Sequence, residues 1–306
     1  MKKFLAAIAL LAAIPAVPHA QTPPPVLQQV AIDLLRDRVP GTTVPLVQRY
    51  ILIDPGNAVP ARDGFEPLER VAVLVLFTGG DGTLGLTANQ VNTGSPNFLA
   101  RNRNHFAAEG FVVALVDAAS DFNQHTHALT TEPDGSVHGS GLRGHRLPTR
   151  LHGDKHLADL VVVMNDLRTR YPGLPIWAVG TSRGTVSAAV TALWVTPPVD
   201  GLVLTASLTG PDASEDLHED SLPLEMITGP VLIVTHRDDA CPITRPEDSE
   251  ALKQRFTASE RVRVKRLDGG STPISLPCDP LAPHGFFGVD QKAVDAITRW
   301  IRRRED

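Results

Sequence analysis

The stretch IWAVGTSRGTVSAAV, residues 176–190, joins a predicted strand to a predicted helix with almost no loop between them. Its first four residues are mostly bulky and apolar, which is typical of a buried strand, and the Ala- and Val-rich residues after Gly184 predict a helix packed on all sides. Ser182 lies between Gly180 and Gly184, at the junction of the two elements. This spacing predicts a sharp, strained turn that lifts the serine hydroxyl clear of the sheet and leaves room for it on both sides.

The rest of the chain alternates between short apolar runs and segments of helical spacing, which predicts an α/β fold with a mostly parallel central sheet and helices on both faces. Residues 23–41 predict a leader and a short helix. The predicted strands are residues 48–54, 71–77, 111–117, 176–180, 201–207, 230–235 and 261–267, and the predicted helices are residues 97–110, 154–171, 185 onward, 246–256 and 291–304.

Length and composition favour one globular domain. The chain has 306 residues, of which 42% are hydrophobic and 21% are charged, so it has ample material for a core. We assign residues 21–306 to this domain. Residues 121–154, rich in Gly, Pro, Thr and His, interrupt the alternation and predict a lid-like excursion. The net charge of −5 provides no basic face for nucleic acid.

The N-terminus is predicted to be a signal peptide over residues 1–20. Lys2 and Lys3 precede the apolar residues 4–17, and Ala20 offers a small residue for cleavage. The apolar run is too short to span a bilayer comfortably, and no later stretch is long enough. We therefore expect an exported protein without a membrane span, either periplasmic or secreted.

Cys241 and Cys278 are the only cysteines. In an oxidising compartment two cysteines pair more often than not, so a disulfide is expected, with two independent buried thiols as the alternative.

A reactive serine needs a base, and the base needs an orienting carboxylate. Ser182 follows a strand, and in an open parallel sheet reactive groups collect at the carboxyl ends of the strands. Strand 230–235 leads into HRDDACP, where Asp238 and Asp239 are both candidates for the acid. His284 follows the last strand and is the candidate base. The helix that begins after Ser182 directs the Arg183 N–H toward a reacting carbonyl oxygen.

From residue 71 to the last helix the sequence resembles the α/β-hydrolase superfamily, through GTSRG, VLIVTHRDDACP and PHGFFG in that order. The resemblance implies a Ser182–His284–Asp239 triad, because His236 aligns with the glycine of the family's HG-x-x-D pattern. Asp238 is the second choice, and His236 is interpreted as structural. In LFTGGDGTLG, residues 76–85, Thr78 replaces the histidine of the family's HGG pattern.

The resemblance also implies an oxyanion hole. Gly80 matches the family's second donor, with Gly79 and Asp81 as neighbours, and the N–H of Arg183 is the other donor. A phosphate cradle is the rival interpretation of the glycine-rich loop, but no Lys-Ser/Thr pair follows it. A Cys241–Cys278 bridge would tie the loop of the acid to the loop of the base.

The predicted function is therefore hydrolysis of a small-molecule acyl substrate, most simply a carboxylic ester, without a metal or organic cofactor. Two alternatives remain: a peptidase or amidase of prolyl oligopeptidase type, and a non-catalytic binding protein on a hydrolase scaffold. Dienelactone hydrolases are also similar, but their nucleophile is cysteine. The sequence predicts no oligomeric state.

Histidines gather in and beside the excursion, where HTH offers a metal-binding alternative. No cysteine or carboxylate pattern of zinc-site spacing accompanies them, so a solvated lid is expected. They are His125, His127, His138, His145, His152 and His156.

Overall fold

The computed structural model describes residues 27–34, 46–57, 68–88, 91, 94–120, 130–131, 137–138, 153–210, 217 and 222–303. The predicted signal peptide, residues 1–20, lies outside the described residues. Of the predicted excursion, the structure describes a short hairpin of β5 (Thr130–Thr131) and β6 (Val137–His138) and the first residues of α2 (Gly153–Arg170).

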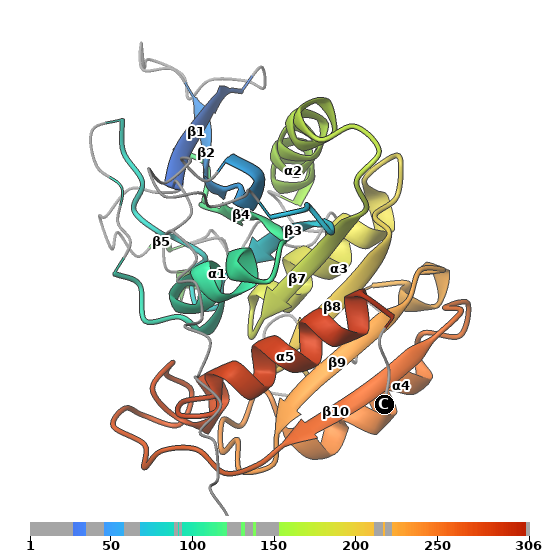
Figure 1. Cartoon of the computed structure of the whole chain (residues 1–306). Helices are drawn as coiled ribbons and strands as arrows, with labels where there is room; N and C mark the ends of the chain where they lie inside the picture. The colour runs from blue at the N-terminus through green and yellow to red at the C-terminus, as the bar shows by residue number, and fades with distance from the viewer. Residues whose placement is uncertain are drawn as a thin grey trace, which may run out of the picture.

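An eight-stranded sheet forms the centre of the molecule, in the order β1-β2-β4-β3-β7-β8-β9-β10 (Figure 1). β1 and β4 pair with β2 antiparallel, and all other neighbours are parallel, so the predicted mostly parallel sheet is confirmed. The strands are β1 (Leu27–Asp33), β2 (Val47–Ile53), β3 (Val73–Phe77), β4 (Val112–Val116), β7 (Ile176–Thr181), β8 (Gly201–Thr205), β9 (Val231–His236) and β10 (Val262–Leu267).

Helices cover both faces of the sheet, as predicted. In Figure 1, α1 (Phe98–Ala108) and α5 (Asp290–Ile301) cross the face toward the viewer, and α2, α3 (Gly184–Trp194) and α4 (Ser249–Gln254) cover the other. Four short 3-10 turns complete the described elements: η1 (Pro55–Asn57), η3 (Leu224–Met226), η4 (Pro246–Asp248) and η5 (Pro283–Gly285).

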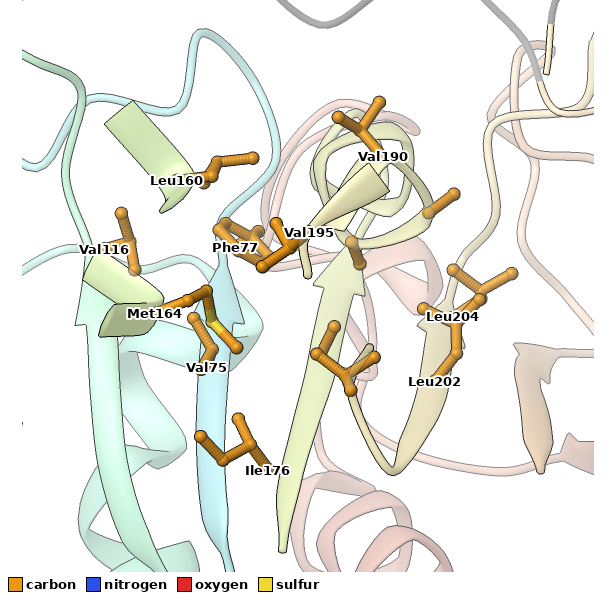
Figure 2. Close-up of a cluster of buried hydrophobic side chains, with 14 of the residues drawn as sticks. Val75, Phe77, Val116, Leu160, Met164, Ile176, Val190, Val195, Leu202 and Leu204 are labelled. Atoms are coloured by element: carbon orange, nitrogen blue, oxygen red, sulfur yellow. The ribbon is translucent and has the colours of Figure 1, made fainter. Parts of the chain in front are cut away.

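Each face of the sheet has its own hydrophobic core, because successive side chains of a strand point to opposite faces. In β3, Val75 packs into the core under α2 and α3, whereas Leu74 packs into the core under α1 and α5. Figure 2 shows Leu160 and Met164 of α2 above Val75 in the first of these cores. The five residues of β3 are all buried, which explains the unbroken apolar run in its sequence.

The helix predicted within residues 23–41 is wrong where the structure describes that segment. Leu27–Asp33 forms edge strand β1, whose seven residues pair in register with β2. Val30 is the only buried residue of β1, and it packs into the core that contains Val75. Pairing with a neighbouring strand therefore overrides the helical interpretation, which considered this segment alone.

Within the described part of the chain, no helix combines the length and apolar character that crossing a membrane requires.

Candidate active site

Ser182 occupies the junction between β7 and α3. Its φ angle is 51°, in the left-handed region that residues other than glycine rarely adopt. The Ser182 N–H donates to the Thr205 carbonyl at 2.9 Å, and the Ser182 carbonyl accepts from the N–H of Thr185 at 2.9 Å and from its hydroxyl at 2.6 Å. Hydrogen bonds on both sides hold this strained conformation. The strained turn expected from the sequence is present.

Lack of space explains the glycines around Ser182. A Cβ on Gly184 would lie 2.1 Å from the Phe77 carbonyl oxygen, and a Cβ on Gly180 would lie 2.3 Å from the Gly184 carbonyl oxygen. Neither Gly180 nor Gly184 has a positive φ. Glycine is therefore required there because other backbone atoms lie too close for a Cβ, and not because of its backbone conformation. α3 can therefore begin directly against the ends of β3 and β7.

His284 and Asp239 meet although 45 residues separate them in the sequence. His284 Nδ1 lies 3.1 Å from Asp239 Oδ2, and both residues are only 6% exposed. Asp239 lies in the turn after β9, where its other oxygen, Oδ1, accepts from the Cys241 N–H at 3.0 Å. His284 lies in η5, before α5. The pair is thus fixed by the end of a strand on one side and a short turn on the other.

Thr244 is a third member of this cluster, and nothing in its local sequence distinguished it. Its hydroxyl donates to Asp239 Oδ2 at 3.0 Å and lies 3.0 Å from His284 Nδ1, and the residue is 1% exposed. Because the Thr244 hydroxyl donates its proton to Asp239, the Thr244 oxygen and the Asp239 carboxylate both face His284 Nδ1 as acceptors. Nδ1 therefore carries the proton of the neutral ring, which leaves a lone pair on Nε2 to act as a base.

Asp238 and His236 take no part in this cluster. Asp238 is exposed, and its N–H donates to His236 Nδ1 at 3.1 Å. The other ring nitrogen of His236 lies 2.9 Å from the Gly269 carbonyl oxygen, and His236 is 1% exposed. Two backbone contacts thus fix the His236 ring between the loops after β9 and β10. Of the two carboxylates left open by the residue pattern, the structure brings Asp239 to His284.

The glycine-rich loop after β3 lies directly against the candidate nucleophile. A Cβ on Gly79 would lie 2.8 Å from the Cβ of Ser182. Gly80 has φ of 66°, so the next residue of the loop also favours glycine. Arg183 is the N-cap residue of α3 and follows Ser182. The two residues predicted to stabilise an oxyanion therefore lie on the two segments that flank the serine.

No hydrogen bond joins the Ser182 hydroxyl to the His284 ring in the described structure, although both residues are more than nine-tenths buried. Bonds between nucleophile and base are often long in unliganded enzymes and shorten when substrate binds. The structure therefore assembles the acid and the base, and it places the serine at the same edge of the sheet.

A disulfide bond joins Cys241 and Cys278, with their Cα atoms 4.6 Å apart. The two residues are 37 positions apart, and closing such a loop stabilises a fold by about 3–4 kcal/mol in the chain-entropy model. Cys241 follows Asp239 by two residues, and Cys278 precedes His284 by six. The disulfide thus restrains the loop of the acid against the loop of the base.

Of the six histidines in and beside the excursion, only His156 has a described side chain. Its Nε2 lies 3.1 Å from the Ser187 hydroxyl, between α2 and α3. Among the described residues, no group of three or more His, Cys, Asp or Glu side chains could hold a metal ion. His156 therefore joins two helices.

No protein-family model and no curated protein sequence matches the chain. Solved structures do resemble it. They include a dienelactone hydrolase from Anabaena variabilis (14% identity, TM-score 0.54, 90% of this chain and 98% of that one). A second is a cold-adapted esterase from an Arctic intertidal metagenomic library (13% identity, TM-score 0.50, 94% of this chain and 99% of that one). A third is a peroxisomal alpha-beta-hydrolase from Saccharomyces cerevisiae (9% identity, TM-score 0.53, 92% of this chain and 89% of that one). At such low identities the likeness shows the fold alone.

Proposed function

We propose that this chain, which has the α/β-hydrolase fold predicted from its sequence, is a serine hydrolase that acts on carboxylic esters. One observation carries the proposal. A buried His284–Asp239 pair lies at the carboxyl edge of the same parallel sheet on which Ser182 occupies a strained turn between strand and helix. A nucleophile, a base and an orienting acid in this chain order suit acyl transfer.

In the proposed reaction, the Ser182 hydroxyl attacks the ester carbonyl while His284 Nε2 accepts its proton. The resulting oxyanion accepts hydrogen bonds from the N–H groups of Arg183 and Gly80. His284 then returns the proton to the leaving alcohol, which departs and leaves an acyl group on Ser182. Water, deprotonated by the same ring, releases the acid. Asp239 holds the ring orientation and stabilises its positive form.

We also propose that the chain is exported. The support is twofold: the signal-like residues 1–20 of the sequence, and the Cys241–Cys278 disulfide, a bond typical of oxidising compartments. Residues 21–306 would then form a single mature domain, either periplasmic or secreted.

The direct test is labelling of the oxidised protein with a fluorophosphonate probe, followed by mass spectrometry of its peptides. We expect one adduct, on the peptide that contains Ser182, because the probe reacts with activated serines and not with ordinary hydroxyl groups. Hydrolysis of p-nitrophenyl esters and of matching anilides would then separate the ester activity from amidase activity. No adduct on the folded protein would contradict catalysis and favour the binding-protein alternative.

Thr244 is proposed to position the acid and the base. Thr244→Val keeps the shape of the side chain but removes the hydroxyl that contacts Asp239 and His284. We expect kcat/KM to fall about tenfold, which corresponds to one lost hydrogen bond of about 1.4 kcal/mol. Thr244→Ser, which retains the hydroxyl, should recover most of the rate. Steady-state ester kinetics measure both.

A suitable control for this prediction is Thr191→Val in α3. It removes another buried hydroxyl, which donates to the Ser187 carbonyl at 2.8 Å. This control should lower stability slightly and leave kcat/KM unchanged. Equal losses of kcat/KM in Thr244→Val and Thr191→Val would refute a specific role for Thr244.

A further inference from the structure

A cavity lies at the edge of the sheet opposite the candidate active site. Its volume is about 460 Å³. Arg70 precedes β3, and Tyr171 lies between α2 and β7, so both lining residues lie at the amino ends of parallel strands. Ser182 follows the carboxyl end of β7. A ligand in this cavity would therefore bind away from the proposed reaction.

Asp54 is the only carboxylate among the described residues that line the cavity, and four hydrogen bonds occupy its two oxygens. Oδ1 accepts from the Gly56 N–H at 2.9 Å and from Arg70 Nε at 2.7 Å. Oδ2 accepts from Arg70 Nη2 at 3.0 Å and from the Tyr171 hydroxyl at 3.1 Å. Asp54 is 4% exposed. Donors of the protein thus occupy both Asp54 oxygens, and its negative charge is paired with Arg70.

Tyr171 remains a donor in this arrangement. Burial, with the nearby Asp54 carboxylate, raises the pKa of the Tyr171 hydroxyl well above its usual value. The hydroxyl therefore keeps its proton at any physiological pH, and Asp54 keeps its hydrogen bond from Tyr171.

Arg70 is held firmly from several sides. Besides its two bonds to Asp54, Nη2 contacts Asn57 Oδ1 at 3.1 Å, and the guanidinium carbon lies 5.9 Å from the centre of the Tyr171 ring. A Cβ on Gly56 would lie 2.4 Å from this carbon, so glycine allows the guanidinium group to approach the η1 backbone. These contacts use Nε and Nη2 and leave Nη1 without a hydrogen bond among the described residues.

Arg170 supplies a second guanidinium group. Its Nε donates to Asp166 Oδ2 at 2.8 Å, one helical turn earlier in α2. The Asp166 carboxylate also accepts from the Tyr50 hydroxyl, which fixes it from the other side. Hydrogen bonds to Asp54 and Asp166 raise the pKa values of Arg70 and Arg170, so both stay charged. The terminal nitrogens of Arg170 have no partner among the described residues.

From this arrangement we infer that the cavity is a binding site for a small oxyanion, a phosphate or a carboxylate. Arg70 and Arg170 both line the cavity, each is held by a carboxylate, and each retains N–H donors without a partner among the described residues. Gln28 and Asn57 line the cavity too. Arg170 retains both terminal nitrogens for a bidentate contact with a planar or tetrahedral oxyanion, and Arg70 retains Nη1 for a single contact. Because both side chains are already held, little side-chain freedom is lost on binding. Among the described lining residues the one carboxylate is Asp54, and its charge is paired with that of Arg70.

The test measures the thermal unfolding midpoint and, by titration calorimetry, the binding of each probe in Tris chloride. Sodium chloride at the same ionic strength is the control. The probes are inorganic phosphate and succinate, which distinguish a phosphate from a carboxylate ligand. When a probe that binds reaches roughly five times its dissociation constant, the unfolding midpoint should rise by about 2–4 °C. A rise no larger than that given by sodium chloride, with either probe, would overturn the inference.

Arg170→Gln removes one guanidinium group from the cavity and should weaken binding about tenfold. Its matched control is Arg299→Gln in α5, because Arg299 forms the same kind of one-turn ion pair, with Asp295, outside the cavity. This control should bind like the unaltered protein. Unchanged binding by Arg170→Gln would contradict the assignment. If that variant does not fold, Arg170→Lys replaces it and should bind several-fold more weakly, because an ammonium group lacks the planar fork.

Discussion

Ser182→Ala is expected to lower kcat for ester hydrolysis by about 10⁴- to 10⁶-fold, the loss seen when the nucleophile of a triad is removed. Without the hydroxyl no acyl-enzyme can form, and the hydrogen-bonded His284–Asp239 pair has no group to activate. Alanine keeps the Cβ and the same backbone strain, so the fold should be unchanged. Ester kinetics, fluorophosphonate labelling and the unfolding midpoint together measure this result.

Ser187→Ala is the matched control for this prediction. Ser187 is likewise a buried serine, and its hydroxyl lies 3.1 Å from His156 Nε2. It lies within α3, however, and not at a strained turn. Ser187→Ala should cost about 1 kcal/mol of stability and leave kcat intact. Retained activity in Ser182→Ala, or lost activity in Ser187→Ala, would contradict the proposal that Ser182 is the nucleophile.

Gly184→Ala should have the largest effect on folding. Its Cβ would lie 2.1 Å from the Phe77 carbonyl oxygen and 2.6 Å from the Thr78 carbonyl oxygen, and both are backbone atoms that no rotamer change can move. α3 would have to shift away from β3 and β7. We expect a loss of more than about 4 kcal/mol, which lowers the unfolding midpoint by roughly 10 °C or more. Calorimetry or circular dichroism on heating measures it.

Gly173→Ala separates crowding from backbone conformation. Gly173 follows α2 with φ of 81°, and a Cβ there would meet no atom within 4 Å. Its replacement should cost only the left-handed conformation of an alanine, about 1–2 kcal/mol. If Gly184→Ala is no more destabilising than Gly173→Ala, that result would contradict the argument that the close approach of α3 to β3 requires glycine at position 184.

The sequence by itself determined most of the elements. The apolar run at residues 71–77 predicted β3, which is buried on both faces, and the junction around Ser182 predicted the strained turn between β7 and α3. These features depend on neighbouring residues: side-chain alternation, helical spacing, and the room that glycine provides. Local physical rules therefore sufficed for them.

Only the tertiary structure showed which of Asp238 and Asp239 contacts His284. It also revealed Thr244 beside that pair and turned residues 27–33 into a strand. Asp238 and Asp239 are adjacent acids, and their difference arises because the turn after β9 buries one beside His284 and exposes the other. β1 forms because β2 offers it a hydrogen-bonding edge. Each outcome depends on a partner distant in the chain, whose approach is fixed by the packing of the whole sheet and not by the local sequence.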